Sequence, residues 1–146
     1  MTPDVNVLVA ASRADHPQHA PAHAWLRAAL AACASGARLE ILPMVASGYL
    51  RVVTHPKVFA QPTPVESALA FIDAILATPG VLMPPVGREW SALRRLCLDG
   101  GLSGNFIPDA WIAAAVRSLD SHLVTFDPGF GKLLSARELT LLPVAA

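Results

Sequence analysis

Carboxylates stand beside apolar segments at three places in this chain. Asp4 begins the apolar stretch that runs to residue 10, Asp109 follows Pro108 after a glycine-rich turn, and Asp127 ends an apolar run. A charged group at the edge of a core needs partners, because burying it unpaired is costly. Carboxylates that gather in one place repel one another, and a divalent cation with oxygen ligands relieves that repulsion. The pattern therefore predicts a metal-dependent chemistry on a phosphodiester substrate.

The elements that must position these acids alternate between strand and helix. Strands are predicted at 4–10, 38–42, 81–86, 122–126 and 139–142, and helices at 19–34, 43–54, 64–77, 88–98, 108–119 and 128–134. This alternation favours a mostly parallel sheet with helices on both faces. Such sheets bind ligands beyond the carboxyl ends of their strands. With these boundaries Asp127 obeys that rule, whereas Asp4 lies at the start of its strand.

Length and composition favour one domain with an apolar surface. The chain has 146 residues, of which 53% are hydrophobic, so it can build one substantial core and we expect a single domain over residues 1–146. Only 15% of the residues are charged, which indicates a surface that a partner or a second copy covers. Eleven basic residues balance eleven acidic ones, which excludes a long-range positive field and leaves a local patch as the way to bind a nucleic acid.

The sequence shows no sign of a membrane or secretory segment. No apolar run approaches the roughly 20 residues that span a bilayer, and no leader pattern opens the chain. We expect a cytoplasmic protein with no membrane partner. Cys33 and Cys97 are isolated, which predicts buried free thiols rather than a metal site.

Four segments, in order, resemble the successive motifs of PIN-domain ribonucleases, and in particular of VapC-type toxins. They are Asp4 to Leu8, Gly48 to Pro56, Leu102 to Ala114 and Leu123 to Phe130. The resemblance covers nearly the whole chain and implies a PIN-like three-layer α/β fold, with a mostly parallel central sheet flanked by helices. It implies a Mg²⁺- or Mn²⁺-dependent endoribonuclease. It further implies the toxin of a type II toxin–antitoxin pair, inhibited by a cognate antitoxin and forming a homodimer.

The resemblance also assigns roles to residues. The catalytic acids and metal ligands would be Asp4, Asp109 and Asp127. Hard cations prefer oxygen ligands, activate water and offset charge on a scissile phosphate. Around the acids, residues that would orient them or a water molecule are Asn6, Asn105 and Thr125. Candidate RNA contacts are Arg51, His55 and Lys57, for which ordinary surface charge is the alternative.

One position departs from the family pattern. Members commonly carry a glutamate two residues before the glycine that aligns with Gly48, and this chain has Ala46 there. One acidic ligand is therefore absent, and neither Glu40 nor Glu66 aligns with it. The departure leaves open a weakened or inactive PIN-fold module that binds RNA. A phosphohydrolase with Asp4 as nucleophile is a further alternative, although Asn6 replaces the second acid of the usual Asp-x-Asp pair.

Two other patterns are candidate binding sites. His16, His19 and His23 lie near the start of a predicted helix, where His19 and His23 could ligate zinc. Because no third ligand is in reach, a solvated or RNA-facing pair is favoured. Gly100 to Gly104 invites a phosphate-loop interpretation, but no Gly-Lys-Ser/Thr follows, and helix termination explains the first two glycines.

Overall fold

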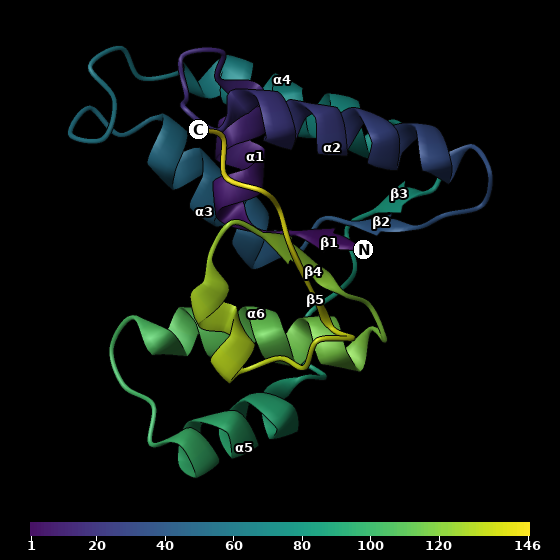
Figure 1. Ribbon diagram of the computed structural model, residues 1–146, viewed down its shortest axis with the longest axis vertical. Coiled ribbons are helices and arrows are strands. Elements are labelled where there is room, and N and C mark those ends of the chain that lie inside the picture. The colour runs from purple at the N-terminus through teal and green to yellow at the C-terminus, as the bar shows by residue number, and fades with distance from the viewer.

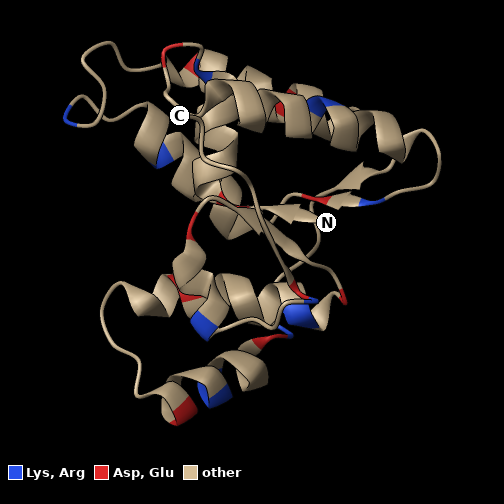
Figure 2. Ribbon diagram, viewed as in Figure 1, with Lys and Arg blue, Asp and Glu red and all other residues tan.

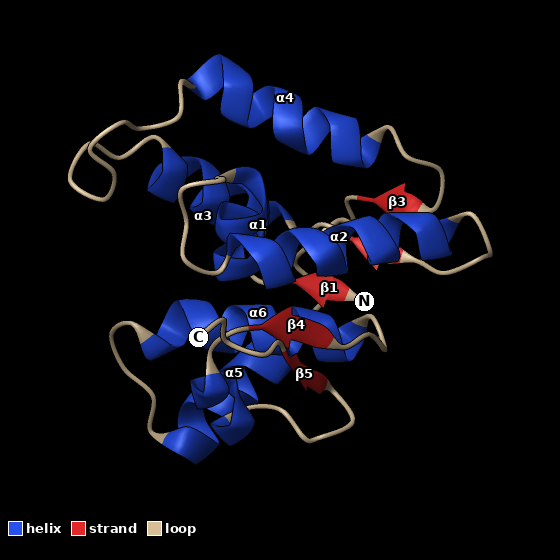
Figure 3. Ribbon diagram, turned by 45° about the horizontal axis from the view of Figure 1, so that its top comes forward, coloured by secondary structure: helices blue, strands red, loops and turns tan.

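Short parallel strands form the centre of the molecule, between two groups of helices (Figures 1 and 3). The computed structural model describes all 146 residues. Strands β1 (Thr2–Pro3), β4 (Leu123–Thr125) and β5 (Leu139–Leu141) form one sheet in the order β1-β4-β5, and β2 (Leu39–Glu40) pairs with β3 (Val81–Leu82). The Glu40 N–H donates to the Met1 carbonyl oxygen at 3.0 Å, which holds β2 beside β1. Every ladder is parallel.

Helices cover the strands on both sides. In Figure 1, helices α1 (Val5–Ser12), α2 (His19–Cys33), α3 (Pro43–Val53) and α4 (Val65–Leu76) lie toward the top, on one side of the strands. Helices α5 (Trp90–Gly100) and α6 (Phe106–Ser118) lie toward the bottom, on the other side. A short 3₁₀ helix, η1 (Pro128–Lys132), follows β4. The predicted α/β fold with a parallel sheet between helices is therefore confirmed.

The predicted strand over residues 4–10 is wrong. The strand is limited to Thr2–Pro3, and α1 begins directly after Asp4, whose side chain caps the helix. Residues Val7 to Ala11 are all buried. A short run of apolar residues that is buried on every side has no periodic pattern that distinguishes a strand from a helix. The sequence pattern therefore could not exclude a strand here. Asp is a preferred residue at the N-cap of a helix, and Asp4 in that position favours a helix start at Val5.

The other boundaries differ mainly at element ends. The strand predicted at 81–86 stops at Leu82, because Pro84 and Pro85 have no N–H to donate to a ladder. Helix α6 starts two residues before the predicted Pro108, and α5 runs to Gly100. Gly101 then ends α5 in the left-handed conformation at φ 57°, as the glycine pair predicted.

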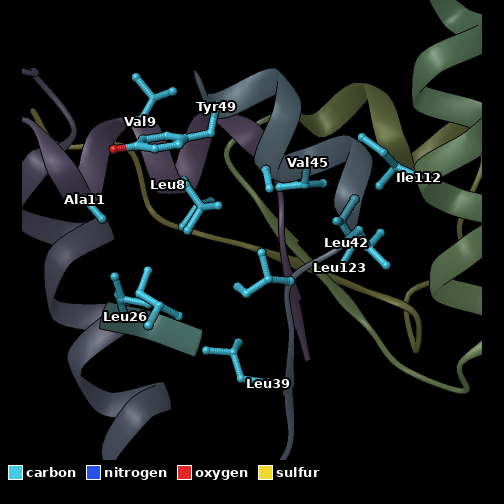
Figure 4. Packing of buried hydrophobic residues seen from close by; sticks show 14 of the residues in the cluster. Leu8, Val9, Ala11, Leu26, Leu39, Leu42, Val45, Tyr49, Ile112 and Leu123 are labelled. Carbon is cyan, nitrogen blue, oxygen red and sulfur yellow. The ribbon is translucent and has the colours of Figure 1, made fainter. Parts of the chain in front are cut away.

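The main core fills the space where α1, α2 and α3 meet the strands (Figure 4). It is a cluster of 25 buried residues, in which the Tyr49 ring of α3 lies against Leu8 and Val9 of α1. Gly48 lets α3 approach α1, because a Cβ there would stand 2.8 Å from Cγ2 of Val5. This close packing fixes the start of α1, and with it Asp4.

The cysteines and the helix lengths were also predicted from the sequence. Both cysteines are free, with Cys33 buried and Cys97 half-buried. None of the helices combines the length and apolarity that a bilayer crossing requires.

Candidate functional site

Asp4 lies beyond the carboxyl end of β1 and at the start of α1. Its N–H donates to the Val124 carbonyl oxygen at 2.9 Å, which aligns β1 with β4. Asp4 is buried, with 6% of its surface exposed. Its carboxylate accepts two hydrogen bonds, from Val5 N at 2.7 Å and from Thr125 Oγ1 at 2.6 Å. Because the strand ends at Pro3, Asp4 lies beyond the carboxyl end of a parallel strand, where such sheets bind ligands. The predicted boundaries had placed it at the start of a strand.

Thr125 links the carboxyl ends of β1 and β4. Its hydroxyl donates to Asp4 and accepts from Asn6 Nδ2 and from the Asp127 N–H, both at 3.0 Å. Asn6 also accepts a hydrogen bond from Phe126 N at 3.3 Å. Thr125 is fully buried, so these bonds are shielded from water and hold the two segments in one arrangement.

Asp109 and Asp127 reach the same region from two other elements. Asp109 is in the first turn of α6, and Asp127 caps η1 by accepting a hydrogen bond from Gly129 N at 2.8 Å. Together with Asp4 they line one cavity of about 360 Å³, which we call the acidic cavity. Figure 2 shows acidic segments after β4, at the start of α6 and at the base of α1, on one side of the molecule.

The charges of these acids are not neutralised by basic side chains. Burial raises the pKa of Asp4, the hydrogen bonds from Thr125 and Val5 oppose that shift, and the charges of Asp109 and Asp127 add to it. Burial and then the charge of Asp127 raise the pKa of Asp109. None of the four ion pairs in the structure includes any of the three. The site is therefore a concentration of negative potential.

The donor set suits a hard divalent cation. Carboxylate oxygens are the ligands that Mg²⁺ and Mn²⁺ prefer, and three mutually repelling acids gain most from such an ion. No group of three His, Cys, Asp or Glu side chains is gathered tightly enough to enclose an ion alone. The three acids share an open cavity, and the ligand chemistry fits an ion that also takes oxygens from water or substrate.

Several predicted residues lie elsewhere. Asn105 is exposed at the start of α6, where its side chain makes no capping bond, and it lines neither the acidic cavity nor the larger one beside it. The candidate RNA contacts Arg51, His55 and Lys57 also line neither cavity.

The histidine and glutamate alternatives also lie apart from the acids. His19 is bonded to the Ala10 carbonyl oxygen at 2.9 Å and lies against the His23 ring, and no zinc-binding group includes them. Ala46 is buried in α3. Glu40 pairs with the N-terminal amine and Arg38, and Glu66 is exposed on α4, so neither replaces the missing acid.

Other walls of the acidic cavity were not found from the sequence. Val58 and Phe59 of the loop after α3 line it, together with His16. Burial lowers the pKa of His16, and its Nδ1 accepts from Gln18 N at 3.0 Å, so the neutral ring carries its proton on Nε2. The turn at residues 12–17 was visible in the sequence, but nothing in it indicated that His16 would face the acids.

A buried arginine secures that loop. Arg13 is 8% exposed and donates to Thr63 Oγ1 and to the Gln61 carbonyl oxygen, each at 3.0 Å. It pairs with Asp15 at 2.7 Å, and its guanidinium lies 3.8 Å from the centre of the Phe59 ring. These contacts place Phe59 at the cavity wall.

Comparisons with known proteins bear on the family and the fold of the chain. The PIN domain family model matches residues 1–133. The chain is 35% identical over 137 residues to Ribonuclease VapC31 of Mycobacterium tuberculosis, covering 93% of this chain and 94% of that protein. It is 38% identical over 136 residues to VapC ribonuclease Mb2897 of Mycobacterium bovis, covering 92% and 90%. The structure resembles a chain of VapBC2 from Rickettsia felis, bound to a DNA fragment from its promoter, with TM-score 0.64, 16% identity and coverage of 97% and 98%.

Proposed function

The chain belongs to the PIN domain family, among its VapC-type members, and on this basis we propose that it is a metal-dependent endoribonuclease. The observation that supports this most is the acidic cavity, in which Asp4, Asp109 and Asp127 meet from three separate elements without basic partners. Relatives at 35% and 38% identity carry the name ribonuclease, which supports RNA as the substrate.

The three aspartates would hold Mg²⁺ or Mn²⁺. When bound, such an ion activates water and offsets charge on the scissile phosphate. The protein's own contribution is to hold the acids in place. Thr125 fixes one oxygen of Asp4, and Asn6 fixes Thr125, so the carboxylate of Asp4 does not rotate away from the cavity. The walls made by Phe59 and Phe130 would limit the access of bulk water to a bound phosphate.

We further propose a toxin that acts in the cytoplasm, with a cognate antitoxin and a second copy of itself as protein partners. The VapC names of the relatives support the first partner, and the low share of charged residues, 15%, supports both. We propose that residues 1–146 form one domain, since a single main core joins residues from Val7 to Leu134.

A second candidate is a module of this fold that binds RNA without cleaving it. Ala46 favours it, because no other acidic residue joins the three aspartates at the acidic cavity. A purified protein that binds RNA but shows no metal-dependent cleavage would support this alternative.

The direct test compares RNA cleavage by the wild type and by Asp4→Asn, with Mg²⁺ or Mn²⁺ and with a chelator. We expect cleavage only for the wild type with metal, because the substitution removes an anionic ligand. Growth arrest on expression should follow the same pattern. Glu66→Gln is the matched control, since Glu66 is an exposed acid outside the cavity. Cleavage by Asp4→Asn at the wild-type rate would refute the mechanism.

A further inference from the structure

A second and larger cavity adjoins the acidic one. Its volume is about 670 Å³, within the range of ~300–1,000 Å³ that is usual for ligand pockets. Asp109 and Asp127 line both cavities, so the two cavities lie side by side at this acidic pair. A chain-like ligand whose phosphate is held at the acids would therefore extend into the larger cavity.

The larger cavity carries an exposed aromatic ring. Phe106, the first residue of α6, lines it and is 54% exposed, although exposing an aromatic ring to water is unfavourable. Every nucleobase has a flat face that can stack on such a ring, whatever the sequence. The other apolar residues that line this cavity are Leu96, Leu102 and Leu133. Together with Phe106 they offer a base an apolar environment.

The larger cavity also carries the one basic side chain near the acids. Lys132, at the end of η1, is the only Lys or Arg that lines either cavity, and it takes part in none of the ion pairs. An unpaired ammonium group on a flexible stem is suited to a phosphate oxygen. Lys132 ends the short helix that Asp127 caps, and both residues line the larger cavity.

We propose that the larger cavity is a nucleotide subsite for single-stranded RNA, in which one base stacks on Phe106 and the neighbouring phosphate pairs with Lys132. The inference rests on the proposed ribonuclease function and adds to it the residues that seat the strand beside the cleaved bond. Phe106 and Lys132 bind and position the substrate, while the aspartates carry the chemistry.

The test measures RNA affinity separately from cleavage. The probe is a fluorescein-labelled single-stranded RNA of random sequence, titrated by fluorescence anisotropy with full-length protein that carries Asp4→Asn. Adding Phe106→Ala should weaken binding about 5- to 150-fold, because stacking contributes ~1–3 kcal/mol per base, and Phe106→Trp should preserve it. Adding Lys132→Gln should weaken binding and reduce the slope of log affinity against log salt by ~0.7, the value for one phosphate contact.

Two matched controls separate the subsite from general surface effects. Trp90→Ala removes a 65% exposed aromatic ring that does not line the cavity, and Arg27→Gln removes a positive charge on α2. Both should leave the affinity unchanged, and thermal unfolding should show that all variants are folded.

The two proposals fail in different ways. If the wild type cleaves RNA but Phe106→Ala and Lys132→Gln bind it as the controls do, the subsite is refuted and the ribonuclease function stands. If the wild type neither cleaves nor binds RNA while folded, both proposals fall. In the wild-type background, the same two substitutions should raise KM for RNA with little change in kcat.

Discussion

The carboxylates of the acidic cavity lower the stability of the fold at neutral pH. The pKa values of Asp4 and Asp109 are raised, chiefly by burial, and each acid gains a further contribution from its acidic neighbours. A folded state that holds protons more tightly than the unfolded chain loses stability as the pH rises through the raised pKa. Such a cost is common where side chains are arranged for function rather than for stability.

Asp109→Asn should therefore raise the Tm near neutral pH while abolishing RNA cleavage. Below the ordinary carboxyl pKa of ~3.9 the wild-type residue is protonated, so the gain in Tm should vanish there. Thermal unfolding across this pH range measures the effect. Glu66→Gln is the control, because Glu66 also stands in the first turn of its helix but is exposed and lies outside the acidic cavity. A lower Tm for Asp109→Asn than for the wild type at neutral pH would contradict the claim that the charged carboxylate of Asp109 destabilises the fold.

Stability and metal binding are linked through the same residues. An ion that binds only the folded state stabilises it by ~2.7 kcal/mol at a hundred times its Kd. Mg²⁺ or Mn²⁺ should therefore raise the Tm of the wild type, and raise that of Asp109→Asn less. Equal shifts in the two proteins would mean that the ion binds outside the acidic cavity.

Helices α1 and α3 fix the position of Asp4 by their close contact. Gly48 of α3 leaves no room for a methyl group beside Val5, which is the first residue of α1 and follows Asp4. Valine is stiff, so it cannot turn its methyl groups away without moving the helix. The contact thus connects the packing of two helices to the geometry of the acidic cavity.

Gly48→Ala should destabilise the fold by roughly 1–3 kcal/mol through overpacking, less up to ~1 kcal/mol gained from the better helix propensity of alanine. It should also reduce cleavage by displacing Asp4. Adding Val5→Ala makes the space and should restore part of both losses. Gly131→Ala is the matched control, because nothing lies within 4 Å of a Cβ at Gly131. Denaturant unfolding gives the energies, and additive effects of Gly48→Ala and Val5→Ala would refute the contact.

The molecule as a whole was only partly predictable from its sequence. Helical periodicity and proline and glycine positions located α2, α3 and α4 within a residue or two, because these helices are amphipathic and have clear ends. Helix α1 has no polar face, so its pattern gave the wrong element. The succession of strands separated by helices was enough to predict that the strands pair in parallel.

The grouping of the three aspartates was predictable from local pattern, whereas the other walls of the acidic cavity depend on tertiary contacts. Asp4, Asp109 and Asp127 stood out because each borders an apolar segment within a motif. Phe59 reaches the cavity through Arg13, which is 46 positions away in sequence, and no local signal records that contact. Phe106 and Lys132 are close in sequence to Asp109 and Asp127 respectively, but the four residues line one cavity only once α6 and η1 have come together.

Net neutrality makes the acidic cavity a local feature of the molecule. With eleven basic and eleven acidic residues, the chain has no overall field to attract a cation or RNA, and Figure 2 shows charged segments spread over several elements. Under the proposed function, recognition of a cation and of RNA then depends on the side chains that line the two cavities.

Crystals of the full chain soaked in Mn²⁺ and measured for anomalous scattering would examine the metal site itself. We predict a peak inside the acidic cavity with oxygens of Asp4, Asp109 and Asp127 around it, and no such peak in Asp109→Asn crystals. An empty cavity at saturating Mn²⁺, or a peak that contacts none of these aspartates, would contradict the proposal that they form the centre of a metal-dependent ribonuclease.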